Sequence, residues 1–326
     1  MTAATFRSTF ARTILAFACI YFIWGSTYLA IRIAIETMPP LVMAGIRFLI
    51  AGGLLAGWVA WRGEWARPTT KQWADASLLG VLFFLGGNGA VCWAETRMPS
   101  GLAALLVAMI PIWIVIFDWL RRGGTRPTAA VLTGVVAGFT GVALLVGRRG
   151  PEGGVDPAGA IVLTVGPAAW ALGTVLSRWL SHPRSVLQSG AMQMLAGGVA
   201  LCLAAFVLGE GSQFHPDAVS ARSILAMLYL ILAGSIIAFS AYIWLLQVAS
   251  PARVGTYAFV NPIVAVVMGW TFAGETFAAN TWIAALFILA GVILIVCFRL
   301  RRSTPAAGHA KVAAGTLAES MKRGEP

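Results

Sequence analysis

Ten apolar runs divide the sequence, and each is about 20 residues long, which is the length an α-helix needs to cross a bilayer. Over the 326 residues only 11% are charged and 59% are hydrophobic, whereas soluble domains carry about 25% charged residues. Because backbone groups in lipid must find their hydrogen bonds within the span, the sequence predicts an all-α integral membrane protein. The predicted spans are residues 13–36, 40–61, 73–95, 99–120, 128–147, 157–180, 186–208, 223–249, 251–273 and 278–298.

Lys and Arg residues between the spans predict which side of the membrane each loop occupies, because cytoplasmic loops are enriched in both. With the N-terminus inside, most of the 23 Lys and Arg residues fall in cytoplasmic segments. The outer segments would hold only Arg32, Arg97, Arg148, Arg149 and Arg222. We therefore expect both termini to be cytoplasmic, with residues 1–12 before the first span and a basic tail without regular structure at 299–326.

Composition and motifs argue against several other classes of protein. The net charge of +11 comes from short basic clusters between apolar spans, so we expect no nucleic-acid partner. The four cysteines lie inside predicted spans without a CxxC pair, and the three histidines lie in loops or the tail, so no metal or haem site is expected. No HExxH, GxSxG or glycine-rich phosphate-loop motif is present. We expect neither an enzyme nor a bound cofactor.

The two halves of the chain repeat each other at an offset of about 145 to 152 residues, which indicates a duplicated architecture. The stretch SGLAALLVAMIPIWIVIFDW at 100–119 matches PARVGTYAFVNPIVAVVMGW at 251–270, with their central prolines aligned. Each half, 13–147 and 157–298, contains five predicted spans, and five is odd, so the second half enters the membrane from the opposite face. Inverted repeats of this kind are typical of secondary transporters with a midplane substrate site. A duplication kept only for folding is the alternative.

Motifs in both halves resemble the EamA branch of the drug/metabolite transporter superfamily, and its inner-membrane exporters in particular. The motifs are IWGSTYLAIRIAIE, PPLVMAGIRFLIAGG, GNGAVCWAE, PSGLAALLVAMIP and SPARVGTYAFVNPIVAVVMG. The resemblance implies ten transmembrane helices in a 5+5 inverted arrangement around a central cavity. It also implies movement of small metabolites, often amino acids or toxic amphipathic compounds, usually outward. In the second half Met192 replaces Arg47 and Leu246 replaces Glu95, so we expect no symmetrical role for those charges.

No ATP-binding motif is present, so the expected mechanism is a secondary carrier in the inner membrane whose two repeats rock about a midplane cavity. An uptake permease of the same fold, or a membrane sensor or scaffold that moves nothing, are the alternatives. The expected partners are a small-molecule substrate and the lipid bilayer, with protons as a candidate coupling ion. The sequence leaves open the substrate, the direction of transport, the coupling ion and the oligomeric state.

Three prolines inside the spans, Pro111, Pro167 and Pro262, are predicted helix breaks. Each removes one hydrogen bond and crowds the carbonyl four residues earlier. A freed carbonyl at membrane depth is tolerated where protein or a watery cavity satisfies it, so the prolines indicate a cavity wall or a hinge. A passive kink that a neighbouring helix satisfies is the alternative.

Aromatic and polar side chains deep in the spans provide the candidates for a substrate site. Helical spacing places Tyr257 and Asn261 on one face of the ninth span, and Trp113 on the equivalent face of the fourth. An aromatic lining with a few hydroxyl and amide groups suits a partly apolar solute, and ordinary helix packing is the alternative. The predicted substrate-binding residues are Trp24, Tyr28, Asn88, Glu95, Trp113, Trp170, Tyr242, Tyr257 and Asn261.

Two charged residues inside spans have open roles. Glu95, near the outer end of the third span, is the candidate for contacting a substrate ammonium group or for proton coupling, because intramembrane carboxylates are costly. A salt bridge with Arg97 is the alternative for Glu95. Arg47 lies about seven residues into the second span and could pair with a substrate carboxylate, although we favour snorkelling to the outer headgroups or bonding to helix carbonyls.

Overall fold

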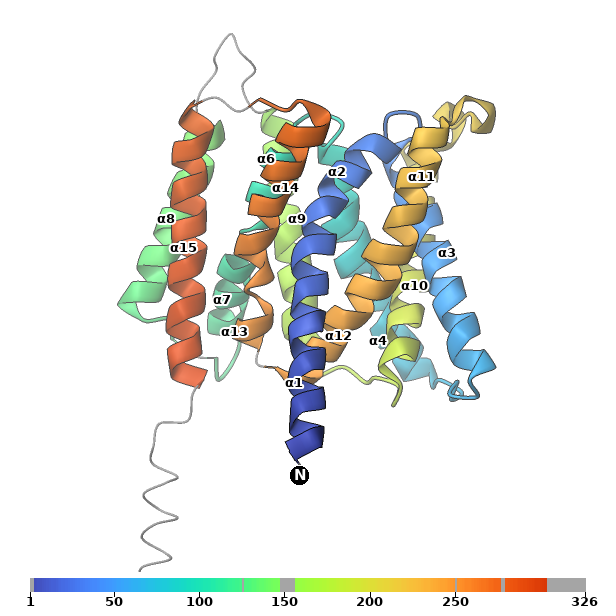
Figure 1. Ribbon diagram of the computed structural model, residues 1–326, viewed down its shortest axis with the longest axis horizontal. Helices are drawn as coiled ribbons and strands as arrows, with labels where there is room; N and C mark the ends of the chain where they lie inside the picture. The colour runs from blue at the N-terminus through green and yellow to red at the C-terminus, as the bar shows by residue number, and fades with distance from the viewer. Residues whose placement is uncertain (1–2, 125, 147–155, 250, 277–278, 304–326) are drawn as a thin grey trace, which may run out of the picture.

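The computed structural model describes residues 3–124, 126–146, 156–249, 251–276 and 279–303. Within these ranges the chain forms a bundle of roughly parallel helices and contains no strand (Figure 1). The elements are α1 (Ala3–Ala18), η1 (Cys19–Ile23), α2 (Trp24–Ala34), α3 (Pro40–Trp61), α4 (Thr70–Gly80), η2 (Val81–Gly89), α5 (Ala90–Ala94), α6 (Ser100–Val107), α7 (Ile110–Leu120), α8 (Ala129–Val146), α9 (Pro157–Leu176), α10 (Val186–Val207), η3 (Glu210–Gln213), η4 (Pro216–Ala218), α11 (Ala221–Tyr229), η5 (Leu230–Ala238), α12 (Phe239–Val248), α13 (Pro251–Val254), α14 (Tyr257–Ala273) and α15 (Ala279–Ser303).

Eight stretches of the described chain are long and apolar enough to span a membrane, which confirms the predicted all-α membrane class. They are Ala11–Ala34, Pro40–Trp61, Thr70–Ala94, Ser100–Leu120, Pro157–Leu176, Val186–Val207, Ala221–Val248 and Thr281–Phe298. Two shorter apolar helices, Ala129–Leu144 and Tyr257–Ala273, lie at the positions of the fifth and ninth predicted spans. Many large apolar side chains, such as Leu54, Phe206 and Ile263, are exposed, as a lipid-facing surface requires. The count of ten spans stays a prediction.

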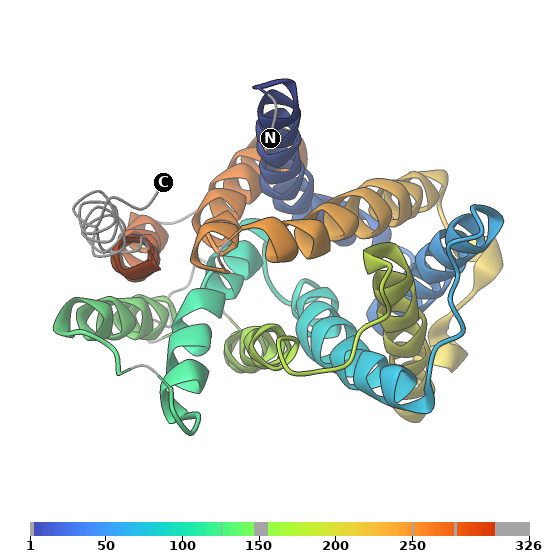
Figure 2. The same cartoon turned by 90° about the horizontal axis from the view of Figure 1, so that it is seen from below.

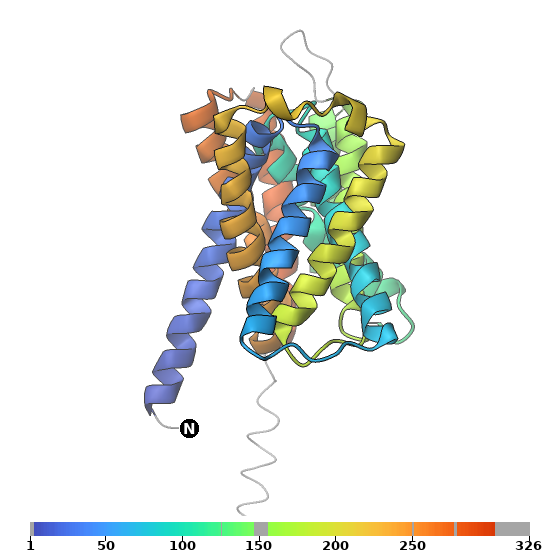
Figure 3. The ribbon, with the colours of Figure 1, turned by 90° about the vertical axis from the view of Figure 1, so that its right-hand side faces the viewer.

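The described ends of the chain lie at the same end of the bundle, where the N-terminal part of α1 projects beyond the other helices (Figures 1 and 3). α15 continues to Ser303, so the helix extends five residues into the tail predicted at 299–326. The remainder of that tail, residues 304–326, lies outside the described residues.

Three of the spans contain π-helical segments, η1, η2 and η5. Both η2 and η5 are nine residues long, and they begin at Val81 and Leu230, an offset of 149 that fits the internal repeat. A π-helical segment departs from the i→i+4 ladder and often marks a functional site. Side chains on either side of such a segment therefore do not keep the relative orientation that α-helical spacing predicts.

The helix breaks do not coincide with all three predicted prolines. The fourth span is interrupted at Ala108 and Met109, between α6 and α7 and directly before Pro111. In the ninth span the interruption lies between α13 and α14, whereas Pro262 is inside the continuous helix α14. Pro167 is likewise inside the continuous helix α9. The predicted break at a proline is therefore present only at Pro111, and the two matched stretches break at different positions.

Equivalent helices of the two halves pack against each other at two places. α3 lies along α10 (Figure 3), and α8 lies along α15 at one edge of the bundle (Figure 2). At the first contact, a Cβ on Gly45 would lie 2.5 Å from Cys202 Sγ; at the second, a Cβ on Gly141 would lie 2.7 Å from the carbonyl oxygen of Ala284. Small residues thus allow close approach of both helix pairs, as is usual between membrane helices.

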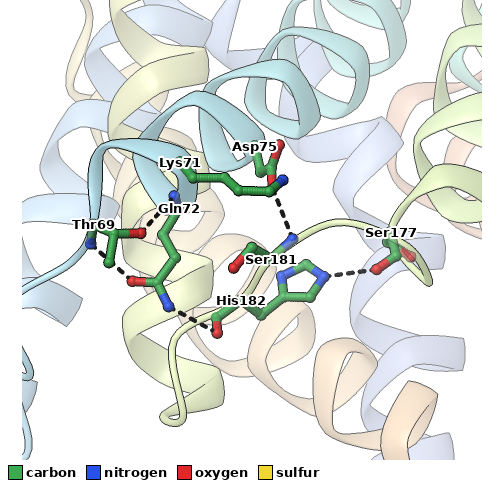
Figure 4. Close-up of polar contacts among 7 residues, drawn as sticks. All are labelled: Thr69, Lys71, Gln72, Asp75, Ser177, Ser181 and His182. Carbon is green, nitrogen blue, oxygen red and sulfur yellow. Dashed lines mark hydrogen bonds and ion pairs between the residues drawn. The ribbon is translucent and has the colours of Figure 1, made fainter.

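The loop between α9 and α10 is hydrogen-bonded to the first turns of α4 (Figure 4). The Asp75 carboxylate accepts from the backbone N–H of Ser181 at 2.7 Å and from Lys71 Nζ at 2.8 Å. Gln72 Nε2 donates to the carbonyl oxygen of His182 at 3.1 Å, and Gln72 also closes a capping box with Thr69. These contacts between the two halves stabilise one end of the bundle. It is the end at which the described chain begins and ends, at residues 3 and 303.

At the opposite end, carboxylates from the second half cap helices of the first half. Glu210 accepts from the backbone N–H groups of Leu41 and Val42 at 2.8 and 3.1 Å, at the start of α3. Glu275 accepts from the backbone N–H and the hydroxyl of Ser100, both at 2.7 Å, and from the N–H of Gly101 at 3.1 Å, at the start of α6. A carboxylate at a helix N-terminus satisfies otherwise unpaired donors and complements the helix dipole.

We expect the Glu275→Gln substitution to lower the stability of the fold by about 1 kcal/mol, because it removes the charge and weakens the acceptors that cap α6. Thermal unfolding of the purified protein in detergent, followed by circular dichroism, measures the effect as a fall in Tm. The matched control is Glu64→Gln, which removes only an exposed ion pair with Arg62 (2.9 Å) and should move Tm less. Equal Tm values for the two variants would contradict this account of the cap.

Candidate substrate cavity

A cavity between the two halves is lined by residues from the interior of the spans. It contains about 710 Å³ of space not filled by atoms, part of which is open to the exterior. Most of its wall is apolar or aromatic, with a few polar groups. The lining residues are Trp24, Thr27, Tyr28, Ile31, Arg47, Phe48, Phe84, Gly87, Asn88, Val91, Val107, Ile110, Pro167, Trp170, Gly234, Ser235, Phe239, Tyr257 and Asn261.

An aromatic cluster forms one wall of this cavity. The ring centroid of Trp24 lies 5.0 Å from that of Tyr242, 5.2 Å from that of Tyr257 and 5.9 Å from that of Trp170. These distances are typical of favourable tilted and edge-to-face ring pairs. Trp24 Nε1 donates to the carbonyl oxygen of Gly234 at 3.1 Å, within the π-helical segment η5. Helices of both halves thus contribute to one rigid aromatic surface.

The structure brings together most of the predicted substrate-binding residues, but not all of them. Trp24, Tyr28, Asn88, Trp170, Tyr257 and Asn261 line the cavity. Tyr242 contacts the cluster and lines a second cavity instead. Trp113 lines neither cavity, because its ring packs against Phe117 and Phe139 at centroid distances of 5.9 and 5.8 Å.

Among the three predicted prolines, Pro167 lines the central cavity. Pro262 lines a groove between α14 and α15, together with Ile263 and Ala285. Pro111 is buried and lies in the lining of neither the central cavity nor that groove. Pro167 is therefore the predicted proline that a solute in the central cavity could contact.

The side chain of Asn261 fixes the position of the first span. With the amide turned so that its nitrogen faces the surrounding acceptors, Nδ2 lies 3.1 Å from the carbonyl oxygens of both Ile20 and Tyr21, in η1, and 3.2 Å from that of Tyr257. Asn261 thus donates hydrogen bonds to carbonyl oxygens of a π-helical segment at membrane depth. Its amide nitrogen is occupied by the protein, so its main contribution is to hold the cavity wall.

Arg47 lies in the cavity wall, although the sequence analysis favours snorkelling or bonding to helix carbonyls for this residue. Its side chain is only 3% exposed and lines the cavity, so it does not snorkel to the headgroups. Arg47 Nε donates to the Ser235 hydroxyl at 2.9 Å, and the guanidinium lies 4.6 Å from the ring centroid of Phe48. Nη1 is buried and has no hydrogen-bond partner in the described part of the chain. A charge at such a depth costs about 2.5 to 3.5 kcal/mol, which favours a use for it.

Glu95 is buried next to the cavity without lining it. Its side chain is 0% exposed, and neither carboxyl oxygen has a hydrogen-bond partner among the residues that the structure describes. Arg32 Nη1 donates to the backbone carbonyl of Glu95, not to its carboxyl group. The predicted alternative, an ion pair with Arg97, is not formed, because the Arg97 guanidinium lies over the Trp93 ring at 4.3 Å.

A second cavity of about 830 Å³ lies toward the end of the bundle that carries the loop of His182. Its lining includes Arg178 and Gln193, so it is more polar than the aromatic wall. Phe239 lines both cavities, and the Tyr242 hydroxyl lies 3.3 Å from Thr174 Oγ1. An aromatic layer, which we define as Phe83, Phe239 and Tyr242, therefore lies between the central cavity and the second one.

We expect Asn261→Leu to lower the stability of the protein by about 1 to 3 kcal/mol, because it removes the amide donor to the carbonyls of Ile20 and Tyr21. The measurement is the Tm of the purified protein without added solute. The matched control is Asn88→Leu, since the Asn88 amide has only a 3.5 Å contact from Cys92 Sγ. A Tm for Asn261→Leu equal to that of Asn88→Leu would show that the amide does not hold the first span.

Comparison with known proteins agrees with this architecture. The EamA-like transporter family matches residues 11–147 and 157–297, which are two consecutive repeats. The chain is 39% identical over 281 residues to an uncharacterized inner membrane transporter, YedA, of Escherichia coli K12, and the match covers 86% of this chain and 89% of YedA. It is 26% identical over 280 residues to protein PecM of Dickeya dadantii, covering 84% and 88% of the two chains.

One solved crystal structure shares the fold with a TM-score of 0.62 at 20% identity, covering 88% of this chain and 98% of its own. At that identity the likeness concerns the fold alone. The family match spans nearly all of the described helices and both walls of the central cavity. The chain therefore belongs to the EamA-like transporter family, and it is a membrane transporter and not an enzyme.

Proposed function

We propose that this transporter is a secondary exporter that carries small metabolites, either amino acids or amphipathic compounds, through the central cavity by alternating access. The observation that carries the proposal is the cavity itself, because its wall is built from mid-span residues of both halves and is mostly apolar or aromatic with a few polar groups. The likeness to YedA, an inner membrane transporter, supports the same location for this chain.

The proposal includes ten spans arranged as two inverted five-helix repeats, with both termini in the cytoplasm. The equal lengths of η2 and η5 support a structural repeat. The Lys and Arg distribution supports the orientation. In such transporters the two repeats move against each other about a fixed midplane site.

The second cavity provides a candidate entrance from the cytoplasm for the proposed outward transport. That cavity lies at the end of the bundle that carries the chain termini, so in the proposed orientation it faces the cytoplasm. A solute would enter it, pass the aromatic layer of Phe83, Phe239 and Tyr242, and reach the central cavity. The contacts of Asp75 and Gln72 with the α9–α10 loop are then candidates for the inner closure, and the caps at Glu210 and Glu275 for the outer closure.

Protons are the coupling ion that the buried groups support best. Neither carboxyl oxygen of Glu95 has a hydrogen-bond partner among the described residues, and within the span region a carboxyl group is more easily kept neutral than charged. In a state that opens Glu95 to water it could release a proton, and in the closed state it could hold one. The proposed cycle therefore exchanges a proton for a solute, with Glu95 as the proton carrier.

We expect purified protein in proteoliposomes to move labelled phenylalanine, leucine or tetraphenylphosphonium down a gradient, and Trp24→Ala to reduce that flux at least tenfold by removing the centre of the aromatic wall. The matched control is Trp119→Ala, because Trp119 is exposed on the surface of the bundle and should not affect flux. Equal flux through both variants would show that the cavity is not part of the transport path. No movement of any of these solutes would favour the sensor or scaffold alternative.

The proton hypothesis predicts that Glu95→Gln abolishes accumulation driven by a pH gradient while leaving exchange of solute for solute in place, because only the net proton step is lost. Uptake into proteoliposomes, with and without a pH gradient, separates the two modes. Glu36→Gln is the control, since Glu36 is a surface residue with a weak 3.5 Å ion pair to Arg222. Gradient-driven accumulation by Glu95→Gln would exclude Glu95 as the proton carrier.

A further inference from the structure

The central cavity contains one positive charge, and no ion pair among the described residues neutralises it. Arg47 is the single charged residue in the lining of that cavity. None of the ion pairs among the described residues involves Arg47, and the nearby carboxylate of Glu210 is engaged by the backbone of Leu41 and Val42. Glu95 is sealed behind the lining. A buried charge without a protein partner calls for a partner from outside.

We propose that Arg47 binds the carboxylate of the transported solute, and that the cavity accepts monocarboxylates with an apolar or aromatic body. This inference rests on the proposed transport function and names the substrate class for it. The guanidinium forms two parallel hydrogen bonds with a carboxylate, and such charge-assisted pairs are among the strongest polar contacts in proteins.

The local geometry positions the guanidinium for such a pair. Nε is held by the Ser235 hydroxyl at 2.9 Å, while Nη1 is left without a partner. The backbone of Gly234 lies beside Nη2, and a Cβ at Gly234 would come within 3.1 Å of it. A structural arginine would have its terminal nitrogens satisfied by the protein, because buried donors are rarely left unpaired. Ser235 is thus a positioning residue and Arg47 the binding residue.

The remaining walls determine what the rest of the solute can be. Phe48 and Phe84, whose ring centroids are 4.3 Å apart, lie near the guanidinium, and Trp24 and Trp170 form the aromatic surface. These walls suit a flat apolar body. A dianionic phosphate would be only half neutralised by Arg47, the single charged residue of the lining, and a cationic amphiphile would meet the charge of Arg47 in a region of low dielectric.

Arg47 is the only such carboxylate-binding residue in the described lining of the central cavity. The position equivalent to Arg47 in the second half is Met192, which is fully buried and apolar. The two halves therefore do not form two anion sites, although they share the same architecture. We expect one carboxylate to be bound per molecule.

The test uses a matched series of solutes with one body and different charges: 3-phenylpropanoate, 3-phenylpropanamide and 3-phenylpropylamine. Each is added to the purified protein in detergent, and the rise in Tm gives the affinity, because a ligand of the folded state stabilises it by mass action. We expect 3-phenylpropanoate to bind at least tenfold more tightly than the amide or the amine. Arg47→Gln should remove this preference, Arg47→Lys should keep part of it, and Ser235→Ala should weaken it without abolishing it.

The control variant is Arg62→Gln, which makes the same change just after the end of α3, at a surface position outside the cavity. Gel filtration and the Tm without ligand verify that Arg47→Gln is folded. Tight binding of the amine, binding of the carboxylate that survives in Arg47→Gln, or no binding of the carboxylate would each overturn the inference. Flux measured with the same proteins separates the two proposals: movement of the amine or of any other solute preserves transport, whereas absence of all flux removes the transport function itself.

Discussion

The fold depends on the requirement that every backbone N–H and C=O at membrane depth be hydrogen-bonded inside the protein. Regular α-helices meet it at the lipid-facing surface. Several irregular segments border the central cavity: η2 and η5 contribute residues to its lining, Val107 and Ile110 on either side of the interruption between α6 and α7 line it, and η1 is hydrogen-bonded by the lining residue Asn261. The Asn261 amide donates hydrogen bonds to carbonyl oxygens of η1, and Trp24 Nε1 donates one to a carbonyl oxygen of η5. The groups that close the hydrogen bonds of the irregular backbone are therefore also the groups that shape the cavity.

The charged side chains of the bundle also need partners inside the protein. Carboxylates at the ends of the bundle cap helices across the two halves, so their cost is offset by backbone donors and helix dipoles. Inside the bundle, Arg47 and Glu95 have no such compensation in the described chain. Arg47 lies in the cavity wall, whereas Glu95 is buried and does not line the cavity. In the proposed mechanism Arg47 binds the solute and Glu95 carries the proton.

Hydropathy predicted where the spans lie, and matched aromatic and polar residues predicted six of the cavity-lining positions, because membrane depth and residue type depend on local sequence. The direction in which each side chain faces is less predictable from the sequence. The prediction for Trp113 assumes one continuous helix through the fourth span, but the span is interrupted at Ala108 and Met109, and the Trp113 ring packs against Phe117 and Phe139. For Arg47 the sequence favours snorkelling or bonding to helix carbonyls over a substrate carboxylate, because nothing in it indicates that Ser235, far away in the chain, accepts a hydrogen bond from Nε. π-Helical segments leave no clear sequence pattern, although the glycines of η2 and η5 are a hint.

The central claim is that the cavity between the two halves is the transport path and opens alternately to both sides of the membrane. The most direct measurement is the accessibility of single cysteines at Val107 and Ile110 to a membrane-impermeant thiol reagent, applied from either side to a transport-competent variant whose four natural cysteines are replaced. The account predicts labelling of both positions from both sides, with protection by transported solute. Labelling from one side only, unaffected by solute, would contradict it.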